Sequence, residues 1–270
     1  HPVAHSFPTR RSSDLSGEKR VIINGMDTII RKRKFNSSGN ILAGEYLFEK
    51  GKQYNYNVYF QNCLDNCSNV IWERKGIEKP DRVIIMGAHY DSENFDDYNG
   101  QTHFLSPGAN DNASGVAALV EIARILNDYE PIYTIKFIFW DNEEIGLRGS
   151  KFYVNEAQKL NEDIIVYMNL DMIGWDKNDD GEFELKYLNK ADSKYYAESI
   201  IDLCSKYNLK LLPILMQGAI DDIHYCGDAG WFWHRGYSAI CISDLLDYSS
   251  CYHSQNDLLY QVAFYKVILR

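Results

Sequence analysis

The run Arg82-Val-Ile-Ile-Met86, followed at once by Gly87-Ala-His89-Tyr-Asp91, decides the expected fold of this chain. Four consecutive apolar residues between polar segments are typical of a strand that is buried on both faces, as in a parallel sheet. A histidine and an aspartate follow it directly, at the end where such sheets bind their ligands. We therefore expect a buried strand over 82–86 with functional side chains at its carboxyl end.

Strand and helix patterns alternate along the rest of the chain. Helical spacing of apolar residues is expected over 39–52, 113–126, 147–160 and 191–207, and strands over 54–60, 69–73, 133–140, 164–170, 211–216 and 239–243. The strands at 54–60 and 69–73 have no helix between them and predict an antiparallel edge. This order predicts an α/β three-layer sandwich, with a mostly parallel central sheet, that antiparallel edge, and helices on both faces.

Composition narrows the class of protein. The chain has 270 residues, of which 45% are hydrophobic, so a large folded core is expected and disorder is not. Lys and Arg number 28 against 38 Asp and Glu, which gives a formal net charge of -10. That balance argues against a nucleic-acid partner or an anionic membrane surface. No segment reaches the roughly 18 apolar residues of a membrane span, so none is expected.

Acidic and histidine side chains recur where the predicted strands end. Five segments carry them: Gly87–Asp91, Pro107–Asn112, Asp141–Glu144, Asn169–Gly174 and Tyr252–Ser254. Together they supply two imidazoles and three carboxylates of the kind that bind metals, with one further glutamate beside them. Two zinc ions and a general base require this inventory.

Each motif also has an ordinary structural interpretation. Asp111 or Asn112 would serve as the N-cap of the helix that follows, and adjacent glutamates such as Glu143 and Glu144 are usually solvated surface. His253 alone would read as a loop histidine. The occurrence of all the motifs together, each after a strand or in a loop at the same edge, favours a metal site over these separate explanations.

The quoted segments resemble those of a known family. MGAHYDS (86–92), SPGANDNASG (106–115), DNEEIGLRGS (141–150), MNLDMIG (168–174) and YHSQND (252–257) are similar to the five signature segments of the co-catalytic di-zinc aminopeptidases, the family of bacterial leucyl aminopeptidases and aminopeptidase Y. The resemblance covers about residues 69–258, with every motif in family order. It implies a zinc-dependent exopeptidase that removes the N-terminal residue of peptides or proteins.

The resemblance also implies a set of ligands for two zinc ions per chain. By this similarity His89 and Asp171 bind one zinc, Glu144 and His253 bind the other, and Asp111 bridges both. A carboxylate suits the bridging position because it has two oxygens, each able to face one cation.

Catalytic roles follow from the same resemblance. Glu143 is expected to be the general base, and Asp91 the carboxylate that fixes the tautomer of His89. Tyr252 is expected either to donate its hydroxyl to the tetrahedral oxyanion or to pack under the rim of the site. The peptide bond from Asp111 to Asn112 is expected to be cis, as it is in relatives.

Two other functions are compatible with parts of this pattern. Glutaminyl cyclases share the fold and the paired acids but use one zinc, and a non-catalytic binding domain of the transferrin-receptor ectodomain type would lose ligands. A carboxypeptidase would need a basic pocket, and no cluster of arginines lies near the motifs. The chain departs from many relatives at Gly227-Asp228-Ala229, where they carry Ser-Asp-His, which affects the rim of the pocket and not the ligands.

The ends of the chain and its cysteines suggest its organisation. His5–Leu15 reads like a translated sequencing adaptor, so we expect residues 1–15 to be a non-native leader and 16–270 a single di-zinc peptidase domain that stops within a last helix from Leu258. Cys63 and Cys67 are spaced for a small surface disulfide, whereas Cys204 and Cys241 are expected to be buried thiols. We expect a secreted or periplasmic protein. The sequence specifies neither the preferred substrate side chain nor the oligomeric state.

Overall fold

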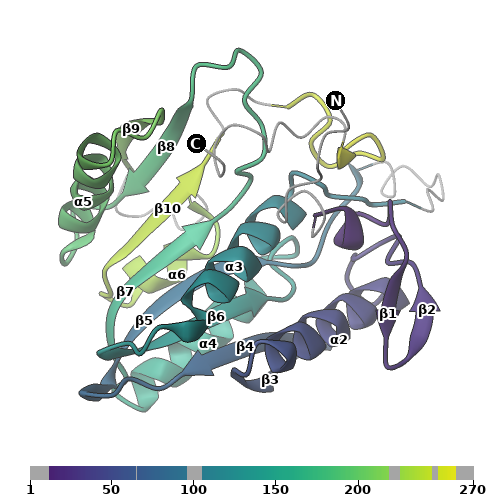
Figure 1. The fold of residues 1–270 in the computed structure, drawn as a ribbon, viewed down its shortest axis with the longest axis horizontal. Coiled ribbons are helices and arrows are strands. Elements are labelled where there is room, and N and C mark those ends of the chain that lie inside the picture. The colour runs from purple at the N-terminus through teal and green to yellow at the C-terminus, as the bar shows by residue number, and fades with distance from the viewer. Residues whose placement is uncertain (1–11, 65, 96–104, 219–225, 245–248, 260–270) are drawn as a thin grey trace.

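An eight-stranded sheet runs through the protein in the order β3-β4-β6-β5-β7-β10-β8-β9 (Figure 1). The computed structural model describes residues 12–64, 66–95, 105–218, 226–244 and 249–259. The strands are β3 (Asn57–Cys63), β4 (Cys67–Arg74), β5 (Lys79–His89), β6 (Tyr133–Trp140), β7 (Asp163–Leu170), β8 (Glu182–Tyr187), β9 (Leu212–Gln217) and β10 (Ala239–Ser243).

The middle of the sheet is parallel and its flanks are partly antiparallel. β5 pairs in parallel with β6 and with β7, and β7 pairs in parallel with β10. β3 and β4 form the antiparallel edge that was predicted, and β4 joins β6 antiparallel as well. On the other flank β8 pairs antiparallel with β10 and parallel with β9. The predicted fold class is therefore confirmed.

Helices cover both faces of this sheet. α2 (Ser38–Gln53), α3 (Ala113–Ile125) and α5 (Ser193–Lys206) lie on one face, and α4 (Arg148–Lys159) and α6 (Ala229–His234) lie on the other, as Figure 1 shows for α2 and α3 in front of the sheet and α4 behind it. Alternate residues of β6 supply the two cores: Phe137 and Phe139 pack toward α2 and α3, whereas Ile138 and Trp140 pack toward α4 and α6. This alternation on a strand covered on both faces explains why apolar residues occupy most of β6, with Thr134 and Lys136 as the polar exceptions.

The predicted elements are present, most with bounds that differ by one to three residues, and β5 is longer than expected. Three features were not predicted: a hairpin of β1 (Val21–Ile23) and β2 (Met26–Thr28), the strand β8 and the six-residue helix α6. A short 3-10 turn (η2, Leu126–Asp128) also follows α3. β8 has the sequence Glu-Phe-Glu-Leu-Lys-Tyr, whose charged side chains Glu184 and Lys186 are buried as an ion pair at 2.6 Å.

The N-terminal end of the described chain packs against the body of the protein. Tyr46 Oη donates to Asp14 Oδ2 at 2.8 Å, and the Leu15 side chain is 1% exposed. Asp14 and Leu15 belong to the predicted non-native leader, residues 1–15. Residues 1–11 lie outside the described part of the chain, so the assignment of a leader stays a prediction. The predicted helix from Leu258 lies almost entirely in residues 260–270, which are also outside it.

The cysteines have the states that the sequence suggested. Cys63 and Cys67 form a disulfide at the turn between β3 and β4. Cys204 and Cys241 are free and buried. Among the described residues, no helix has both the length and the apolar content that crossing a bilayer requires.

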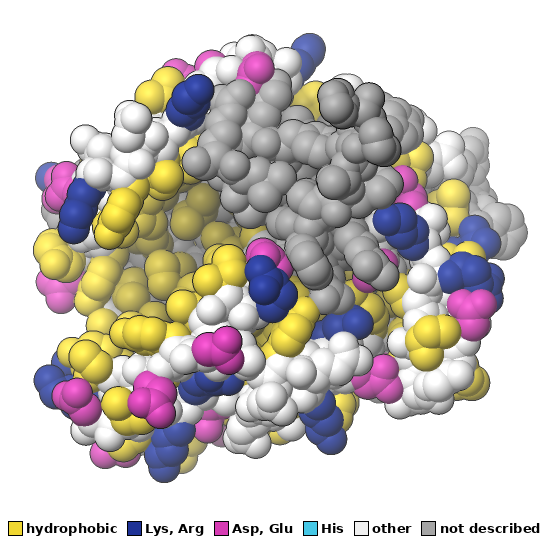
Figure 2. Space-filling view, in the orientation of Figure 1, with side chains coloured by type: hydrophobic (Ala, Val, Ile, Leu, Met, Phe, Trp, Pro, Cys, Tyr) yellow, Lys and Arg dark blue, Asp and Glu magenta, His cyan; other side chains and the backbone are white. Residues whose placement is uncertain are grey.

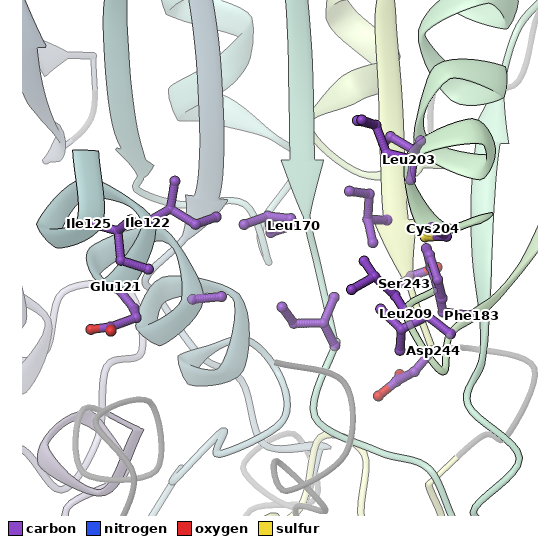
Figure 3. Close-up of a pocket in the computed structure, with 15 residues that line it drawn as sticks. Glu121, Ile122, Ile125, Leu170, Phe183, Leu203, Cys204, Leu209, Ser243 and Asp244 are labelled. Atoms are coloured by element: carbon purple, nitrogen blue, oxygen red, sulfur yellow. The ribbon is translucent and has the colours of Figure 1, made fainter. Parts of the chain in front are cut away.

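An apolar pocket of about 360 Å³ opens on the face that carries α3 and α5 (Figure 3). Ile122 and Ile125 of α3 form one wall, Leu203 of α5 forms another, and Leu170 of β7 lies in the floor between them. Figure 2 shows this hollow as a continuous hydrophobic surface on the left of the view. The pocket is mainly apolar, and Leu170 and Ile173 of the segment Asn169–Gly174 contribute to its lining.

Candidate metal centre

The predicted site residues gather at the carboxyl ends of β5, β6 and β7. His89 is the last residue of β5 and lies opposite Trp140, the last residue of β6, while Gly87 lies opposite Asn169 of β7. This register brings the segment after Trp140 and the aspartate after Leu170 beside His89. Because neighbouring parallel strands end at the same edge, residues far apart in sequence meet there.

Asp111 lies between the two histidines. Its Oδ1 is 3.1 Å from His89 Nε2, and its Oδ2 is 2.9 Å from His253 Nε2. The Asp111 side chain is only 4% exposed. Each carboxylate oxygen therefore faces a different imidazole, and the residue that was predicted to bridge two centres stands between them.

Each histidine has a second carboxylate neighbour. Asp171 Oδ1 lies 3.4 Å from His89 Nε2, and Glu144 Oε2 lies 2.8 Å from His253 Nε2. The donor atoms of His89, Asp111 and Glu144 all lie within 4.8 Å of one another. All five side chains that the sequence nominated as ligands thus converge on one place, in two pairs around Asp111.

Several atoms in this cluster that could bind a metal ion lack a hydrogen-bond partner. His253 Nε2 touches two carboxylates, yet neither contact has hydrogen-bond geometry, and the buried Glu144 Oε1 has no partner among the described residues. His253 Nε2 lies close to Asp111 Oδ2 and Glu144 Oε2 but points directly at neither oxygen. This arrangement suits three ligand atoms that surround one bound ion. Buried polar atoms without partners are rare in proteins and call for an explanation.

Asp91 braces the site in two ways, of which the sequence suggested one. Its Oδ1 lies 3.4 Å from His89 Nδ1, beside the ring that it was predicted to orient, although this contact does not have hydrogen-bond geometry. The same carboxylate also accepts from the backbone N–H groups of Glu143 and Glu144, at 3.1 and 3.2 Å. Asp91 therefore couples the position of His89 to the turn that carries both glutamates.

Glu143 lies at the edge of the cluster, close to Gly227. A Cβ atom added to Gly227 would lie 3.3 Å from Glu143 Oε1 and 3.0 Å from Asp171 Oδ2, so a side chain at this position would press on both carboxylates. Burial raises the pKa of Glu143 well above its usual value, and the neighbouring Glu144 adds to that rise against the opposing effect of His89. A carboxylate with a raised pKa suits a role in proton transfer.

The electrostatics of the cluster favour positive charge. Burial raises the pKa of Glu144 to about 8, and the nearby Asp111 carboxylate raises it as well. Burial alone would lower the pKa of His253, but its contacts with Asp111 and Glu144 outweigh burial and raise the value to about 10. The raised pKa values of both Glu144 and His253 are consistent with a negative electrostatic potential in the cluster, which a bound cation would neutralise.

Tyr252 lies beside the cluster, stacked on the ring of His253 with a centroid distance of 3.8 Å. Phe95 approaches both rings edge-on, at 6.0 Å from Tyr252 and 4.5 Å from His253. The aromatic contacts position His253. Burial raises the pKa of the half-buried Tyr252, and the negative charge of the nearby Asp111 contributes to this rise. Both predicted interpretations of Tyr252 remain compatible with this placement.

The loop before α3 has the geometry that was predicted. The peptide bond between Asp111 and Asn112 is cis. Asn112 is the N-cap of α3, since its side chain accepts from the backbone N–H of Gly115 at 3.0 Å. Its amide also donates to Leu170 O at 2.9 Å, which fastens the start of α3 to the end of β7.

Sequence reasoning missed three buried charged residues around the site: Arg33, Asp228 and Asp257. Asp257 ends the quoted segment YHSQND, and Asp228 stands in the segment that departs from the family pattern, so both had a signal that could have been followed. Burial, with smaller contributions from Asp171 and Asp91, raises the pKa of Asp228 to about 7 against the opposing effect of His89. Arg33 lies in the basic run Arg31-Lys-Arg33-Lys34, which reads as solvated surface and gave no signal.

A mostly parallel sheet with paired acids and imidazoles at its carboxyl edge defines an α/β protein with a candidate two-metal centre. The chain belongs to peptidase family M28, whose sequence profile matches residues 69–264.

Named relatives agree with this assignment. The chain is 41% identical over 118 residues to a probable zinc metalloprotease of Pyrenophora teres f. teres, covering 43% of this chain and 24% of the relative. It is 30% identical over 247 residues to aminopeptidase YwaD of Bacillus subtilis, covering 84% of this chain and 50% of that protein. The chain thus spans half or less of the length of these relatives.

Solved structures show the same fold. The zinc aminopeptidase BSAP from Bacillus subtilis superimposes with a TM-score of 0.61 at 27% identity, over 74% of this chain and 46% of that one. A glutaminyl cyclase from Bacteroides thetaiotaomicron superimposes with a TM-score of 0.68 at 18% identity, over 97% and 92% of the two chains, which shows the fold alone.

Proposed function

We propose that this protein is a zinc-dependent aminopeptidase that binds two zinc ions and hydrolyses the N-terminal residue of peptides. One observation carries the proposal: the two oxygens of Asp111 face two different histidines, at 3.1 and 2.9 Å, and each histidine has a further carboxylate beside it. A single carboxylate between two such pairs matches the requirement of a two-metal site.

The side chains present fit a pair of zinc ions. Imidazole nitrogens and carboxylate oxygens are the usual ligands of catalytic zinc. Glu144 Oε1 and His253 Nε2 could both bind zinc, because neither atom makes a hydrogen bond with any of the described residues. Bound zinc would act as a Lewis acid and lower the pKa of a water molecule toward about 7.

We assign the ligands as His89 and Asp171 for one ion, Glu144 and His253 for the other, and Asp111 for both. Asp91, at 3.4 Å from His89 Nδ1, would hold the ring with Nε2 directed at the ion. The register of β5, β6 and β7 supports this assignment for His89, the last residue of β5, and for Asp171, which directly follows β7.

Glu143 is assigned as the general base. Its carboxylate lies beside the ligands, near Asp171, but makes no direct contact with either histidine that the structure records. In this role it takes a proton from the attacking water and returns it to the leaving amine. Tyr252 would donate its hydroxyl to the oxyanion that forms when the peptide carbonyl is attacked.

Alternative functions have weaker support. A glutaminyl cyclase would need one metal, whereas two pairs of imidazole and carboxylate gather here around Asp111. A non-catalytic domain would have no need to keep all five ligand side chains together with the half-buried Glu143. The names of the relatives, a zinc metalloprotease and an aminopeptidase, also favour hydrolysis.

We also propose that the protein is secreted or periplasmic and that residues from 16 onward form a single peptidase domain. The disulfide between Cys63 and Cys67 supports an oxidising compartment. The single sheet that contains every strand from β3 to β10 supports one domain. Peptide or protein N-termini would be its partners.

The decisive experiment combines metal analysis with a panel of substrates. Purified protein is analysed for zinc, treated with a chelator, and assayed before and after zinc is restored on aminoacyl chromogenic substrates and on peptides with N-terminal Gln. Two zinc ions per chain and zinc-dependent release of the N-terminal residue are expected. Cyclisation of the Gln peptides with one zinc, or full peptidase activity in metal-free protein, would refute the proposal.

A further inference from the structure

Arg33 is the one arginine that the structure describes as completely buried, at 0% exposure, and it bonds to the loops next to the candidate metal centre. Its guanidinium makes no ion pair that the structure records and donates to backbone carbonyls. Nε donates to Tyr90 O at 2.7 Å, Nη1 to Pro107 O and to Leu15 O at 2.6 Å each, and Nη2 to Gly108 O at 2.9 Å. Removing a guanidinium from water costs free energy, and here carbonyl groups and not a carboxylate compensate for that cost. The cost suggests that Arg33 fixes a geometry that the protein needs.

Three of these four carbonyls belong to the loops that carry the proposed ligands. Tyr90 stands between His89 and Asp91, and Pro107 and Gly108 lie a few residues before Asp111. A Cβ atom at Gly108 would lie 2.9 Å from Arg33 Nη2, so the second loop approaches the guanidinium closely. The planar fork of Arg33 thus spans the gap between the two loops and fixes their separation.

Asp257 holds the second loop from the other side. Its Oδ1 accepts from the backbone N–H of Asn110 at 2.9 Å, and its Oδ2 accepts from that of Asp111 at 3.0 Å. Burial lowers the pKa of Arg33 to about 10, and among the nearby acids Asp257 opposes that effect most strongly. Segment 107–111 therefore runs between a fixed cation that binds its carbonyls and a fixed anion that binds its N–H groups.

We propose that Arg33 is a positioning residue of the metal centre, which sets the distance between His89 and Asp111 by clamping the backbone at Tyr90 and at Pro107–Gly108. The inference rests on the proposed function, because it assigns the clamp to a site that binds metal. A lysine could not replace it, since an ammonium has three donors around one nitrogen and cannot bridge two loops as a rigid fork does.

The test compares Arg33→Met and Arg33→Lys with the wild-type protein and with Arg82→Met. Arg82 is a matched control because it is an arginine whose bond to Asp163 lies at the surface, with 44% of its side chain exposed. Three properties are measured: amide hydrogen exchange over 105–112 in metal-free protein, affinity for Zn²⁺ and the visible spectrum with Co²⁺, and kcat and KM separately.

Arg33→Met is expected to raise the exchange rate over 105–112 at least about 10-fold and to weaken Zn²⁺ binding by about 10- to 100-fold, as is typical when a group that orients metal ligands is lost. At saturating Zn²⁺, kcat should fall by about 10²-fold with KM within about 2-fold, because the donors are misplaced while the substrate pocket is intact. Arg33→Lys should recover the folded state and the unfolding midpoint, but not Zn²⁺ affinity or the Co²⁺ spectrum. Arg82→Met should match wild type in all three.

The two proposals fail in different ways. If the wild-type protein binds no metal, the proposed function is wrong, and the exchange rates in metal-free protein still decide whether Arg33 clamps the loop. If Arg33→Met does not fold, Arg33→Lys decides. Wild-type exchange, Zn²⁺ affinity and kcat in a folded Arg33 variant would overturn the positioning role.

Discussion

Two buried clusters of charged side chains lie toward opposite ends of the central sheet, and they differ in how their charges are paired. Toward the amino ends of β5, β6 and β7, Lys136 bonds to Glu162 and contacts Tyr153 Oη at 3.1 Å, while Tyr153 Oη donates to Glu162 at 2.9 Å. These side chains line a cavity of about 610 Å³. In this group of Lys136, Tyr153 and Glu162, the two charged side chains pair with each other, and each also contacts the tyrosine hydroxyl.

The cluster at the carboxyl ends has an excess of acids. Around His89 and His253, several carboxylates are buried together, and both oxygens of Asp228 as well as Glu144 Oε1 lack hydrogen-bond partners among the described residues. The comparison teaches that burial of charge does not by itself mark function. A closed set of partners is sufficient for structure, whereas crowded acids with unused donor atoms call for a cation from outside the chain.

The largest expected effect follows from removing the proposed base without touching a ligand. Glu143→Gln should lower kcat by at least about 10²- to 10⁴-fold while both zinc ions stay bound, because an amide cannot take the proton. Kinetics with a chromogenic substrate and metal analysis of the same sample check this. Loss of zinc in this variant would mean that the roles of Glu143 and Glu144 are reversed.

A change at the centre of the acidic cluster should affect the metals themselves. Asp111→Asn keeps the shape of the side chain but removes the charge that faces both histidines, so Zn²⁺ affinity should fall by more than the about 10- to 100-fold seen for outer-sphere groups. Titration against a competing chelator measures it. Two zinc ions bound with unchanged affinity would contradict the bridging assignment.

The paired cluster should respond in the opposite way. Lys136→Met should lower the free energy of unfolding by roughly 3 kcal/mol, at the low end for a broken buried pair, because 19% of the Glu162 side chain is exposed. It should leave kcat and KM within about 2-fold. Urea unfolding measures the stability, and Lys159→Met, which removes a surface bridge with 70% of its lysine exposed, is the control at under about 0.5 kcal/mol. A loss of activity with normal stability would remove the distinction between the clusters.

The smallest expected effect concerns the rim of the acidic cluster. Tyr252→Phe keeps the ring that stacks on His253 and removes only the hydroxyl. If that hydroxyl stabilises the oxyanion, kcat should fall by about 10²-fold, the low end for a lost oxyanion donor, with unchanged zinc content. Activity within about 2-fold of wild type would assign Tyr252 to packing alone.

Much of the fold could be predicted because it depends on local patterns. The segments 83–86 and 137–140 are wholly apolar, which is typical of strands that are covered on both faces. The alternating sequence of β8 is compatible with a strand, but the burial of its charged face could not be predicted: Glu184 and Lys186 pair with each other, and Ser243 donates to Glu184. A local pattern records the hydrophobicity of a residue but not the partner that neutralises it.

The candidate site divides in the same way between sequence and tertiary structure. The sequence by itself determined which side chains are candidates for the chemistry, because acids and histidines after apolar strands are visible one segment at a time: His89, Asp111, Glu143, Glu144, Asp171 and His253. Only the tertiary structure decided that Asp111 faces both histidines and that Arg33, one of four consecutive basic residues, is the one that is fully buried. These are contacts between segments more than twenty residues apart, and their distances are set by strand register and loop packing, which no local pattern encodes.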